Sequence, residues 1–385
     1  MNHGWNKKKL GELTDFKYGY PFDSKKFNMD CNGMPLIRIR DVIPGRTSTY
    51  YDGEFSDEYI IKSGDYLIGM DGEFNIARWN SYEALLNQRV CKVMSADNNV
   101  MLNQFLYFFL KIELKRIEEY TPFVTVKHLS AKTLNNIIIP IPPLNIQNKL
   151  VSELDKINEL IGVKRSQLKD LDALAQSLFY ETFGDPLENS KRWNVGTLSE
   201  YANFKNGLNF TPADDGNKIK CLGVGDFKSN RYIKTENLPE INIVEAVSEE
   251  YRLKDGDIIL VRSNGNKALI GRSIMYVSDN SLATFSGFCI RCRYNREKLA
   301  PLFLSYYLSC GAIREYITSQ GRGCNISNLN QKILSGIPLI LPPLSLQNEF
   351  AEKIEAIEEQ KRLIESSIAN LETLLASRMD YWFND

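Results

Sequence analysis

Apolar residues recur along this chain in two alternating patterns. In residues 1–140 and again in 187–340 they form short runs broken by glycine, proline and asparagine, a pattern typical of β-strands joined by turns. A longer run with helical spacing interrupts each region, at 104–119 and at 301–319. The clearest strand candidates are Leu36–Arg40 and Asp257–Val261. The pattern therefore predicts two globular domains of mixed α/β class.

The regions 141–186 and 341–385 have a different pattern. Each begins with Pro-Pro-Leu, and proline is tolerated only up to the first turn of a helix, so a long helix should start there. Apolar residues then recur at 3.5-residue intervals over about four heptads, which predicts a coiled-coil seam. The seam positions are Leu150, Leu154, Ile157, Ile161, Leu168, Leu171, Phe350, Ile354, Ile357, Ile364, Ile368 and Leu371. An amphipathic helix lying on a domain is the alternative, but matched length and phase favour pairing of the two helices.

The four regions are two copies of one unit. Ile141-Pro-Pro-Leu-Asn-Ile-Gln-Asn returns 200 residues later as Leu341-Pro-Pro-Leu-Ser-Leu-Gln-Asn, and Phe16-Lys-Tyr-Gly returns as Phe204-Lys-Asn-Gly. Each helix of about 35 residues would span roughly 50 Å. If the helices pair antiparallel, the second returns the chain to the first domain. We therefore expect a cyclic repeat with a pseudo-two-fold axis, in which the two chain ends meet.

Two seam positions carry lysine in one copy only. Lys164 stands where the other copy has Ile364, and Lys361 stands where the other copy has Ile161. A polar residue at a seam position commonly fixes register or orientation at a cost in stability. We hypothesise that these two lysines have that role.

Charge follows the repeat. The 385-residue chain has a formal net charge of −1, but the four regions carry +1, −2, +5 and −5 in chain order. The positive charge therefore lies in the two domains and the negative charge in the two helices. The N-terminus has no apolar signal segment and no apolar run is long enough to cross a bilayer, so we expect no membrane association. Seven dispersed cysteines favour a reducing, cytoplasmic location.

Catalytic and metal-binding patterns are weak. The chain has two histidines, His3 and His128, which excludes histidine-based triads and multi-histidine metal sites. Cys289-Ile-Arg-Cys292 is a Cys-x-x-Cys motif, but a strand would point its two cysteines to opposite faces, which favours core packing over zinc. No phosphate-binding glycine loop is present. We therefore expect no catalytic residue, metal or cofactor in this chain.

Polar and basic loops remain at corresponding places in both domains. Arginine, lysine, asparagine and glutamine are the side chains that pair with base edges in the DNA major groove, whereas phosphate contacts carry no sequence information. A solvated surface charge is the plainer interpretation of any single residue, so the grouping matters more than its members. The candidates are Arg38, Arg40, Arg46, Asn75, Arg78, Trp79, Lys127, His128, Lys228, Arg231, Arg262, Asn264, Asn266, Lys267, Arg322 and Asn325.

With its duplication and motifs, the whole chain resembles the specificity subunits of type I restriction–modification systems. The second copy carries Gly321-Arg-Gly, Ile326-Ser-Asn-Leu and Leu341-Pro-Pro-Leu, the last with Gln347 at the start of a long helix. The first copy retains Leu129, the Pro-Pro-Leu and Gln147, with Thr121-Pro-Phe in place of Gly-Arg-Gly.

The resemblance implies two target-recognition domains that read an asymmetric bipartite site in double-stranded DNA, held apart by the helices. It also implies docking of two copies of a DNA adenine methyltransferase subunit, with S-adenosylmethionine, ATP and magnesium bound by partner subunits and none by this chain. Whether restriction subunits join stays open. Two alternatives stay open as well: the specificity component of a methylation-only assembly, and a bivalent scaffold that reads no DNA. The near-zero net charge predicts weak DNA binding by the isolated chain.

Overall fold

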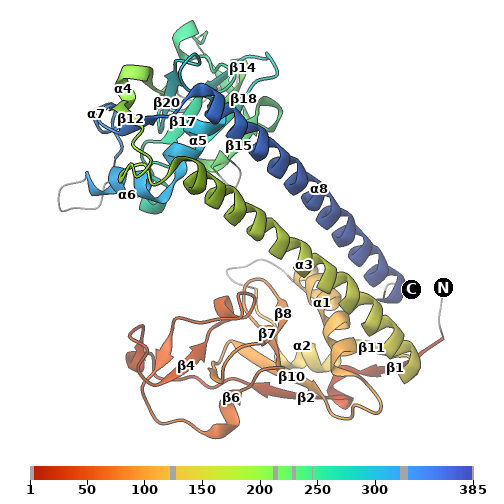
Figure 1. Cartoon of the computed structure of the whole chain (residues 1–385). Helices are drawn as coiled ribbons and strands as arrows, with labels where there is room; N and C mark the ends of the chain where they lie inside the picture. The colour runs from red at the N-terminus through yellow and green to blue at the C-terminus, as the bar shows by residue number, and fades with distance from the viewer. Residues whose placement is uncertain are drawn as a thin grey trace. The chain divides into compact units, whose positions relative to one another are not determined.

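The computed structural model describes residues 4–121, 127–210, 216–227, 231–244, 246–320 and 328–383. The chain divides into two compact units: unit 1 comprises Met1–Lys164 and Ser366–Asp385, and unit 2 comprises Arg165–Glu365. Each unit contains one globular part and one half of each of two long helices, α3 (Leu144–Phe183) and α8 (Leu344–Phe383) (Figure 1). The predicted division at residues 140, 186 and 340 stays a prediction, because the compact units divide each helix near its middle.

The globular part of unit 1 is built from two sheets. Strands β2, β10, β7 and β8 form a four-stranded sheet in that order, and β3, β5, β4, β9 and β6 form a second, while β1 pairs with β11. The strands are β1 (Asn6–Lys9), β2 (Thr14–Tyr18), β3 (Phe27–Asn28), β4 (Met34–Ile37), β5 (Tyr50–Tyr51), β6 (Ile60–Ile61), β7 (Tyr66–Gly69), β8 (Asn75–Arg78), β9 (Ala84–Leu86), β10 (Val90–Ser95) and β11 (Ile138–Ile141). The short helices are α1 (Asn103–Tyr120) and α2 (Ala131–Asn136). Helix α1 packs against the four-stranded sheet, with the rings of Tyr66 and Tyr107 5.3 Å apart.

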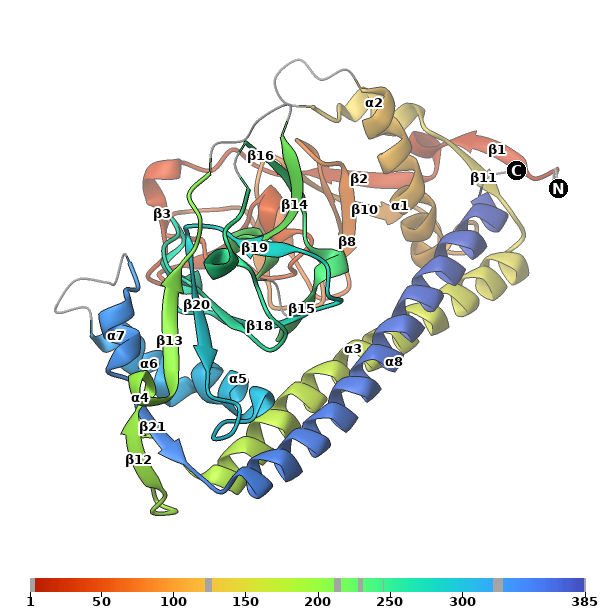
Figure 2. The ribbon, with the colours of Figure 1, turned by 90° about the horizontal axis from the view of Figure 1, so that it is seen from above.

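Unit 2 is likewise built from two sheets and a separate strand pair. Strands β13, β20, β17, β18 and β15 form one sheet and β16, β14 and β19 another, while β12 pairs with β21 (Figure 2). The strands are β12 (Asn194–Thr197), β13 (Ala202–Asn206), β14 (Asn217–Leu222), β15 (Tyr232–Lys234), β16 (Glu240–Ile243), β17 (Ile258–Val261), β18 (Ser273–Val277), β19 (Ala283–Phe285), β20 (Cys289–Tyr294) and β21 (Pro338–Leu341). The short helices are α4 (Leu198–Tyr201), α5 (Pro301–Ser309), α6 (Gly311–Ser319) and α7 (Gln331–Ser335). The two units share a core, as the repeat predicts: the order β13-β20-β17-β18 repeats β2-β10-β7-β8, and β12–β21 repeats β1–β11. They differ outside it, since β15 extends the unit 2 sheet and the second sheet has three strands in place of five.

The helix predicted over 104–119 is α1, but the one predicted over 301–319 is two helices. The chain is extended at Cys310, with ψ of 153°, between α5 and α6. The break lets α6 take its own direction and bury Ile313 and Ile317 in the unit 2 core. The strand predicted over 36–40 ends at Ile37, because the Asp41 side chain accepts a hydrogen bond from the Arg38 backbone N–H (2.9 Å) and caps a 3-10 helix at Ile39–Asp41.

Both long helices begin directly after Pro-Pro, as predicted, and the glutamine of the repeated motif anchors each start. Gln147 is fully buried: its Oε1 accepts from the Leu102 N–H, and its Nε2 donates to the carbonyls of Val100 and Pro142, each at 2.9 Å. Gln347 makes the same three bonds in unit 2. This side chain therefore ties the start of each long helix to the segment that leads into α1 or α5.

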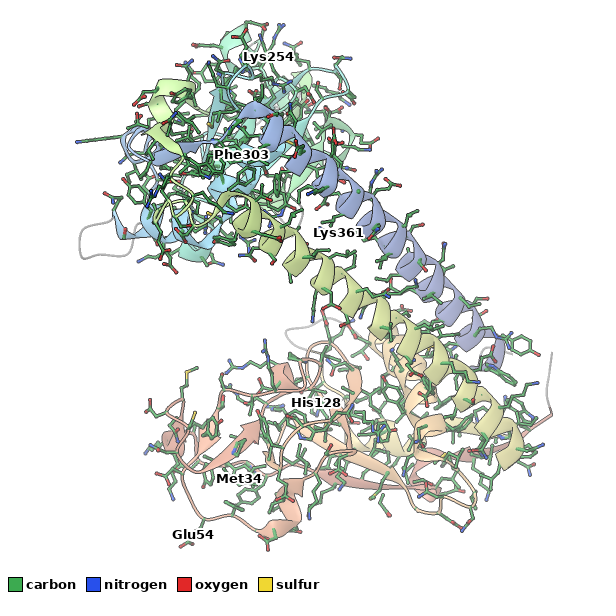
Figure 3. The ribbon with its side chains drawn as sticks, viewed as in Figure 1. Met34, Glu54, His128, Lys254, Phe303 and Lys361 are labelled. Atoms are coloured by element: carbon green, nitrogen blue, oxygen red, sulfur yellow. The ribbon has the colours of Figure 1, made fainter. Side chains whose placement is uncertain are left out.

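Within each unit the two helix halves pair antiparallel. In unit 1 the guanidinium of Arg378, near the end of α8, bonds to the carboxylate of Glu153, near the start of α3. In unit 2 the rings of Phe179 and Phe350 lie 5.9 Å apart. Lys361 (labelled in Figure 3) is 13% exposed and forms ion pairs with Asp172 (2.8 Å) and Glu358 (3.1 Å).

The predicted seam residues are buried to different degrees. Those nearest the helix starts are buried, and those toward the middle are half-buried, because the helix starts also pack against the globular parts. The buried set is Leu150, Leu154, Ile157, Ile161, Phe350, Ile354 and Ile357. The half-buried set is Leu168, Leu171, Ile364, Ile368 and Leu371.

The two chain ends join the same core, as the cyclic repeat predicts. Met379 and Trp382 are buried in the unit 1 cluster, and Trp5 and Phe383 pack against it. The ring of Phe383 lies 5.6 Å from that of Phe105. Among the helices in the described part of the chain, none is long and apolar enough to cross a membrane.

Candidate nucleic-acid interface

In unit 1, four segments that are distant in sequence meet at one end of the β7–β10 ladder. We call residues 38–41, 70–75, 87–89 and 127–129 the unit 1 edge. Backbone hydrogen bonds join them: the Met70 N–H donates to the Arg89 carbonyl (3.1 Å), and the Leu129 N–H donates to the Met70 carbonyl (2.7 Å). The 3-10 helix that begins at Ile39 lies beside Gly69, because a Cβ placed there would come within 3.1 Å of Ile39 Cγ1.

An acidic residue organises the charges of this edge. The Asp71 carboxylate forms an ion pair with Arg89 Nη1 at 2.7 Å through Oδ2 and lies 2.6 Å from His128 Nδ1 through Oδ1 (His128 is labelled in Figure 3). The side chain of Asp71 is only 19% exposed, whereas those of Arg89 and His128 are 53% and 54% exposed. A carboxylate at the base of the edge thus holds two cationic or polar groups at its surface.

Unit 2 has the same framework. We call residues 223–226, 262–267, 286–288 and 328–330 the unit 2 edge. The Arg262 N–H donates to the Phe288 carbonyl (2.8 Å), and the Leu329 N–H donates to the Arg262 carbonyl (2.7 Å), in the places held by Met70, Arg89 and Leu129 in unit 1.

The side chains of the unit 2 edge differ from those of unit 1. Phe288 stands at the position of Arg89 and is 61% exposed. It borders a hollow of about 380 Å³ that is also lined by Val224, Ser263, Asn264 and Gly265. The unit 2 edge therefore presents an aromatic ring and amide groups where unit 1 presents a guanidinium, an imidazole and a carboxylate.

Several predicted DNA contacts lie on the unit 1 edge. Arg38 precedes the 3-10 helix, Arg40 lies within it, and both are exposed. Asn75 begins strand β8, and Lys127 and His128 come from the segment before α2. Lys127 is partly engaged within the protein, because its Nζ donates to the carbonyl of Glu118 at 2.6 Å. Arg46 is exposed but lies outside the four segments.

One of the unit 1 predictions is wrong, and a second residue lies away from the edge. Trp79 is 1% exposed and belongs to a core cluster, and its indole Nε1 donates to the Tyr82 carbonyl, so it packs the interior. Arg78 is exposed and ends strand β8 at the opposite end from Asn75, so its role as a DNA contact stays a prediction. Burial raises the pKa of Asp155 on α3, and the positive charge of Arg78 opposes that rise.

The predicted residues of unit 2 divide in the same way. Arg262, Asn264, Asn266 and Lys267 lie on the edge, where Asn266 caps a short 3-10 helix by accepting from the Ala268 N–H. Arg231 packs inward: its guanidinium lies 3.9 Å from the centre of the Tyr306 ring and donates to Ser309 Oγ. Three further candidates lie outside the described residues: Lys228, Arg322 and Asn325.

Sequence reasoning missed Arg89, Asp71 and Phe288. Each is a single residue in a turn, and the duplication was the one signal that could have found them. Aligning β10 with β20 places Arg89 and Phe288 at the same turn position, because Val90 and Cys289 begin the two strands. At this matched, exposed turn position, unit 1 has a guanidinium and unit 2 has a phenyl ring.

The prediction that the two cysteines of the Cys-x-x-Cys motif point to opposite faces of a strand is confirmed. Cys289 and Cys292 lie on strand β20 in different core clusters, so their side chains point to opposite faces. Burial raises the pKa of both thiols, which disfavours the thiolate that a metal requires. In the described ranges no group of three or more histidine, cysteine or acidic side chains is placed to hold a metal ion.

The sequence matches a known protein family. The family model described as the type I restriction modification DNA specificity domain matches residues 2–172 and 190–373, once for each copy of the repeat. The type I restriction enzyme EcoBI specificity subunit of Escherichia coli is 26% identical over 96% of this chain and 82% of its own length. The StySPI specificity subunit of Salmonella potsdam is 25% identical over 98% of this chain and 87% of its own length.

Two solved structures share the fold. The S subunit of a type I restriction–modification system from M. genitalium has a TM-score of 0.54 at 16% identity, covering 100% of this chain and 97% of that one. A chain from a structure titled for complex assembly and conformational transition of the type I R-M system has a TM-score of 0.56 at 18% identity, covering 98% and 97%.

Proposed function

Because this chain belongs to the family of type I restriction–modification DNA specificity subunits, we propose that its two edges each read one half of a bipartite DNA site. The chain is the DNA-recognition subunit of such a system and not a catalytic subunit; specificity subunits act with modification and restriction subunits. One observation carries the proposal for the edges. Two units with a shared core sheet hold the same backbone hydrogen bonds at their edges but present different side chains, which suits two related readers of two different sequences.

The long helices support a role as a spacer. Each has 40 residues, which corresponds to roughly 60 Å at 1.5 Å per residue. One turn of DNA is about 34–36 Å long, so helices of this length are long enough to relate two separated major-groove sites. We infer that the antiparallel pairing seen within each unit continues along both helices as a coiled coil that sets the unread gap.

The repeat also supports a symmetrical docking surface for partners. A two-fold repeat presents the same surface twice, which suits two copies of an adenine methyltransferase subunit. The helical regions 141–186 and 341–385 carry net charges of −2 and −5, which fits a protein partner better than a DNA-facing surface. S-adenosylmethionine, ATP and magnesium would then be bound by the partner subunits.

The test is co-expression with a methyltransferase subunit of the same system, followed by mapping of methyladenine in the host genome. A bipartite motif with a fixed gap is the expected result. Deleting one heptad from each helix, at positions outside the two globular cores, shortens the helices by roughly 10.5 Å and should shorten the gap by at most about three base pairs without changing either half of the motif.

Other outcomes would identify the alternatives. A bipartite motif in a host without an associated restriction subunit would point to a methylation-only assembly. Absence of sequence-dependent DNA binding, even with the methyltransferase present, would leave only a bivalent scaffold. The Lys164→Leu and Lys361→Leu double variant tests the orientation hypothesis separately: an unchanged gap and unchanged methylation would contradict a role of these lysines in register.

A further inference from the structure

The two edges differ most sharply at one turn position. In unit 1 the turn between β9 and β10 ends in Arg89, and in unit 2 the turn between β19 and β20 ends in Phe288. The turns have the same internal hydrogen bond, from the Val90 N–H to the Asn87 carbonyl and from the Cys289 N–H to the Ser286 carbonyl, both at 2.9 Å. Because the backbones agree, the side chain is what distinguishes the two positions.

The backbone of this turn is held firmly, so its side chain starts from a defined place. A Cβ at Gly19 would lie 2.0 Å from the Asn87 carbonyl oxygen, and a Cβ at Gly207 would lie 2.0 Å from the Ser286 carbonyl oxygen. The residues that directly follow β2 and β13 therefore approach the turns at a distance that only glycine permits. The sequence motif that returns as Phe-Lys-x-Gly in both copies is explained by this approach.

In unit 1 the carboxylate of Asp71 holds the guanidinium. The ion pair through Nη1 uses a small part of the five-donor guanidinium fork, and the side chain stays 53% exposed. A fork whose remaining donors are presented in a fixed plane suits bidentate pairing with the O6 and N7 acceptors of guanine. The second carboxylate oxygen is occupied by His128, so Asp71 does not present a bare negative charge to DNA.

In unit 2 the described residues that line the hollow beside the phenyl ring of Phe288 are uncharged. Phe288 is 61% exposed beside a hollow lined by Ser263 and Asn264, and exposure of a large apolar ring to water is unfavourable. A phenyl ring has no hydrogen bond to offer a base edge, but it can cover the C5-methyl group of thymine, which is the apolar feature of the major groove.

We propose that this turn position determines specificity in each half-site: Arg89 reads a guanine, Asp71 positions Arg89, and Phe288 contacts the methyl group of a thymine. The inference rests on the proposed function and adds to it the residues and bases that define one position of each half-motif. It also predicts that the two half-motifs change independently.

The first experiment compares methylation motifs after co-expression with the methyltransferase subunit. Arg89→Ala should relax one base position in one half-motif, with about 5- to 150-fold less discrimination against other bases, and leave the other half-motif unchanged. Arg89→Lys keeps the charge but loses the fork, so it should relax the same position. Arg116→Ala is the matched control: it removes an arginine of similar exposure, paired with Glu113 on α1, and should not alter the motif.

The second experiment uses base analogues in synthetic DNA and the assembled complex. Replacing the mapped guanine by 7-deazaguanine, which lacks the N7 acceptor, should weaken wild-type binding but not weaken Arg89→Ala further. Replacing the mapped thymine by uracil removes one methyl group, which should weaken wild-type binding about fourfold and leave Phe288→Ala unaffected. Asp71→Asn should weaken binding while keeping the guanine preference, as expected for a positioning residue.

The outcomes separate the two proposals. If the wild-type complex gives no bipartite motif, the proposed function fails. If the wild-type motif is bipartite but Arg89→Ala and Arg89→Lys weaken all sites equally without relaxing a position, Arg89 contacts phosphate and the inference is overturned. Should Arg89→Ala fail to assemble, Arg89→Lys and the analogue series decide the question, since neither removes the side chain.

Discussion

The buried glutamine at the start of each long helix provides a sharp test of how the repeat is held together. Gln347→Leu keeps a side chain of similar size but removes three hydrogen bonds of 2.8–3.0 Å, to the Ala300 N–H and to the carbonyls of Lys298 and Pro342. At about 1 kcal/mol for each net hydrogen bond, the free energy of unfolding of unit 2 should fall by about 3 kcal/mol. In this variant the buried N–H of Ala300 also loses its hydrogen-bond acceptor. Leaving a buried donor unpaired adds a further cost, so the loss should not be smaller than about 3 kcal/mol.

The assay should resolve the two units, because a single unfolding curve does not describe a chain of two units. Urea-dependent hydrogen exchange, followed by mass spectrometry of peptides from α5 and from α1, reports each unit separately. With a urea m-value of about 2–3 kcal/mol/M, the midpoint for α5 peptides should fall by roughly 1 to 1.5 M in Gln347→Leu. Peptides of α1 should keep their midpoint.

Two further variants complete the design. Gln147→Leu is the matching variant in unit 1, where the wild-type Gln147 side chain makes the same three bonds. It should lower the urea midpoint of α1 peptides by the same amount and leave that of α5 peptides unchanged. Gln360→Leu changes an exposed glutamine on α8 and should change neither midpoint appreciably. A shift in α5 peptides below about 0.3 M, or one equal to that of Gln360→Leu, would refute the anchoring argument.

Three other predictions follow from single contacts. Gly207→Ala should lower the stability of unit 2 by about 2–3 kcal/mol, since its Cβ would lie 2.0 Å from a backbone oxygen, whereas Gly265→Ala meets nothing within 4 Å and should not; thermal unfolding compares them. Gly162→Ala, in the exposed middle of α3 with open space around it, should raise stability by roughly 0.5–1 kcal/mol in the same assay, and a loss would contradict the helical geometry. The hydrogen bond from Arg378 lowers the pKa of Glu153, so this carboxylate stabilises the fold above its unfolded pKa of about 4.3, and the stabilisation disappears as pH falls through the lower folded value. Wild type should therefore lose more stability than Glu153→Gln between pH 5 and pH 3, measured by urea midpoints.

Much of the architecture could be predicted because it rests on local pattern. The heptads and the Pro-Pro-Leu signals define helices that begin at Leu144 and Leu344, and the duplication predicts the core sheet order that both globular parts share. The opposite orientation of Cys289 and Cys292 follows from strand geometry alone. These features depend on neighbours close in sequence or on a direct comparison of the two copies.

The candidate interface could be predicted only in part. Lys127, His128 and the 262–267 loop, all singled out from the sequence, lie on the edges, but the pattern could not show that Trp79 is interior or that Arg231 packs on Tyr306. Burial of a polar or aromatic residue is decided by partners that come from other elements. The break at Cys310 has the same origin. The direction of α6 is set by packing of its apolar residues in the unit 2 core, which the helical spacing of the sequence does not show.

By itself, the sequence determined the duplication, the two long helices, the cyclic path of the chain and the weakness of any catalytic pattern. Only the tertiary structure decided which side chains meet at the two edges. Asp71, Arg89 and His128 are separated by up to 57 residues, and they come together because β7 pairs with β10 and the segment after α1 bonds back to Met70. Periodicity in a sequence records the period of each element, whereas the register between elements is set by long-range pairing, and in this protein that register forms the surfaces proposed to read DNA.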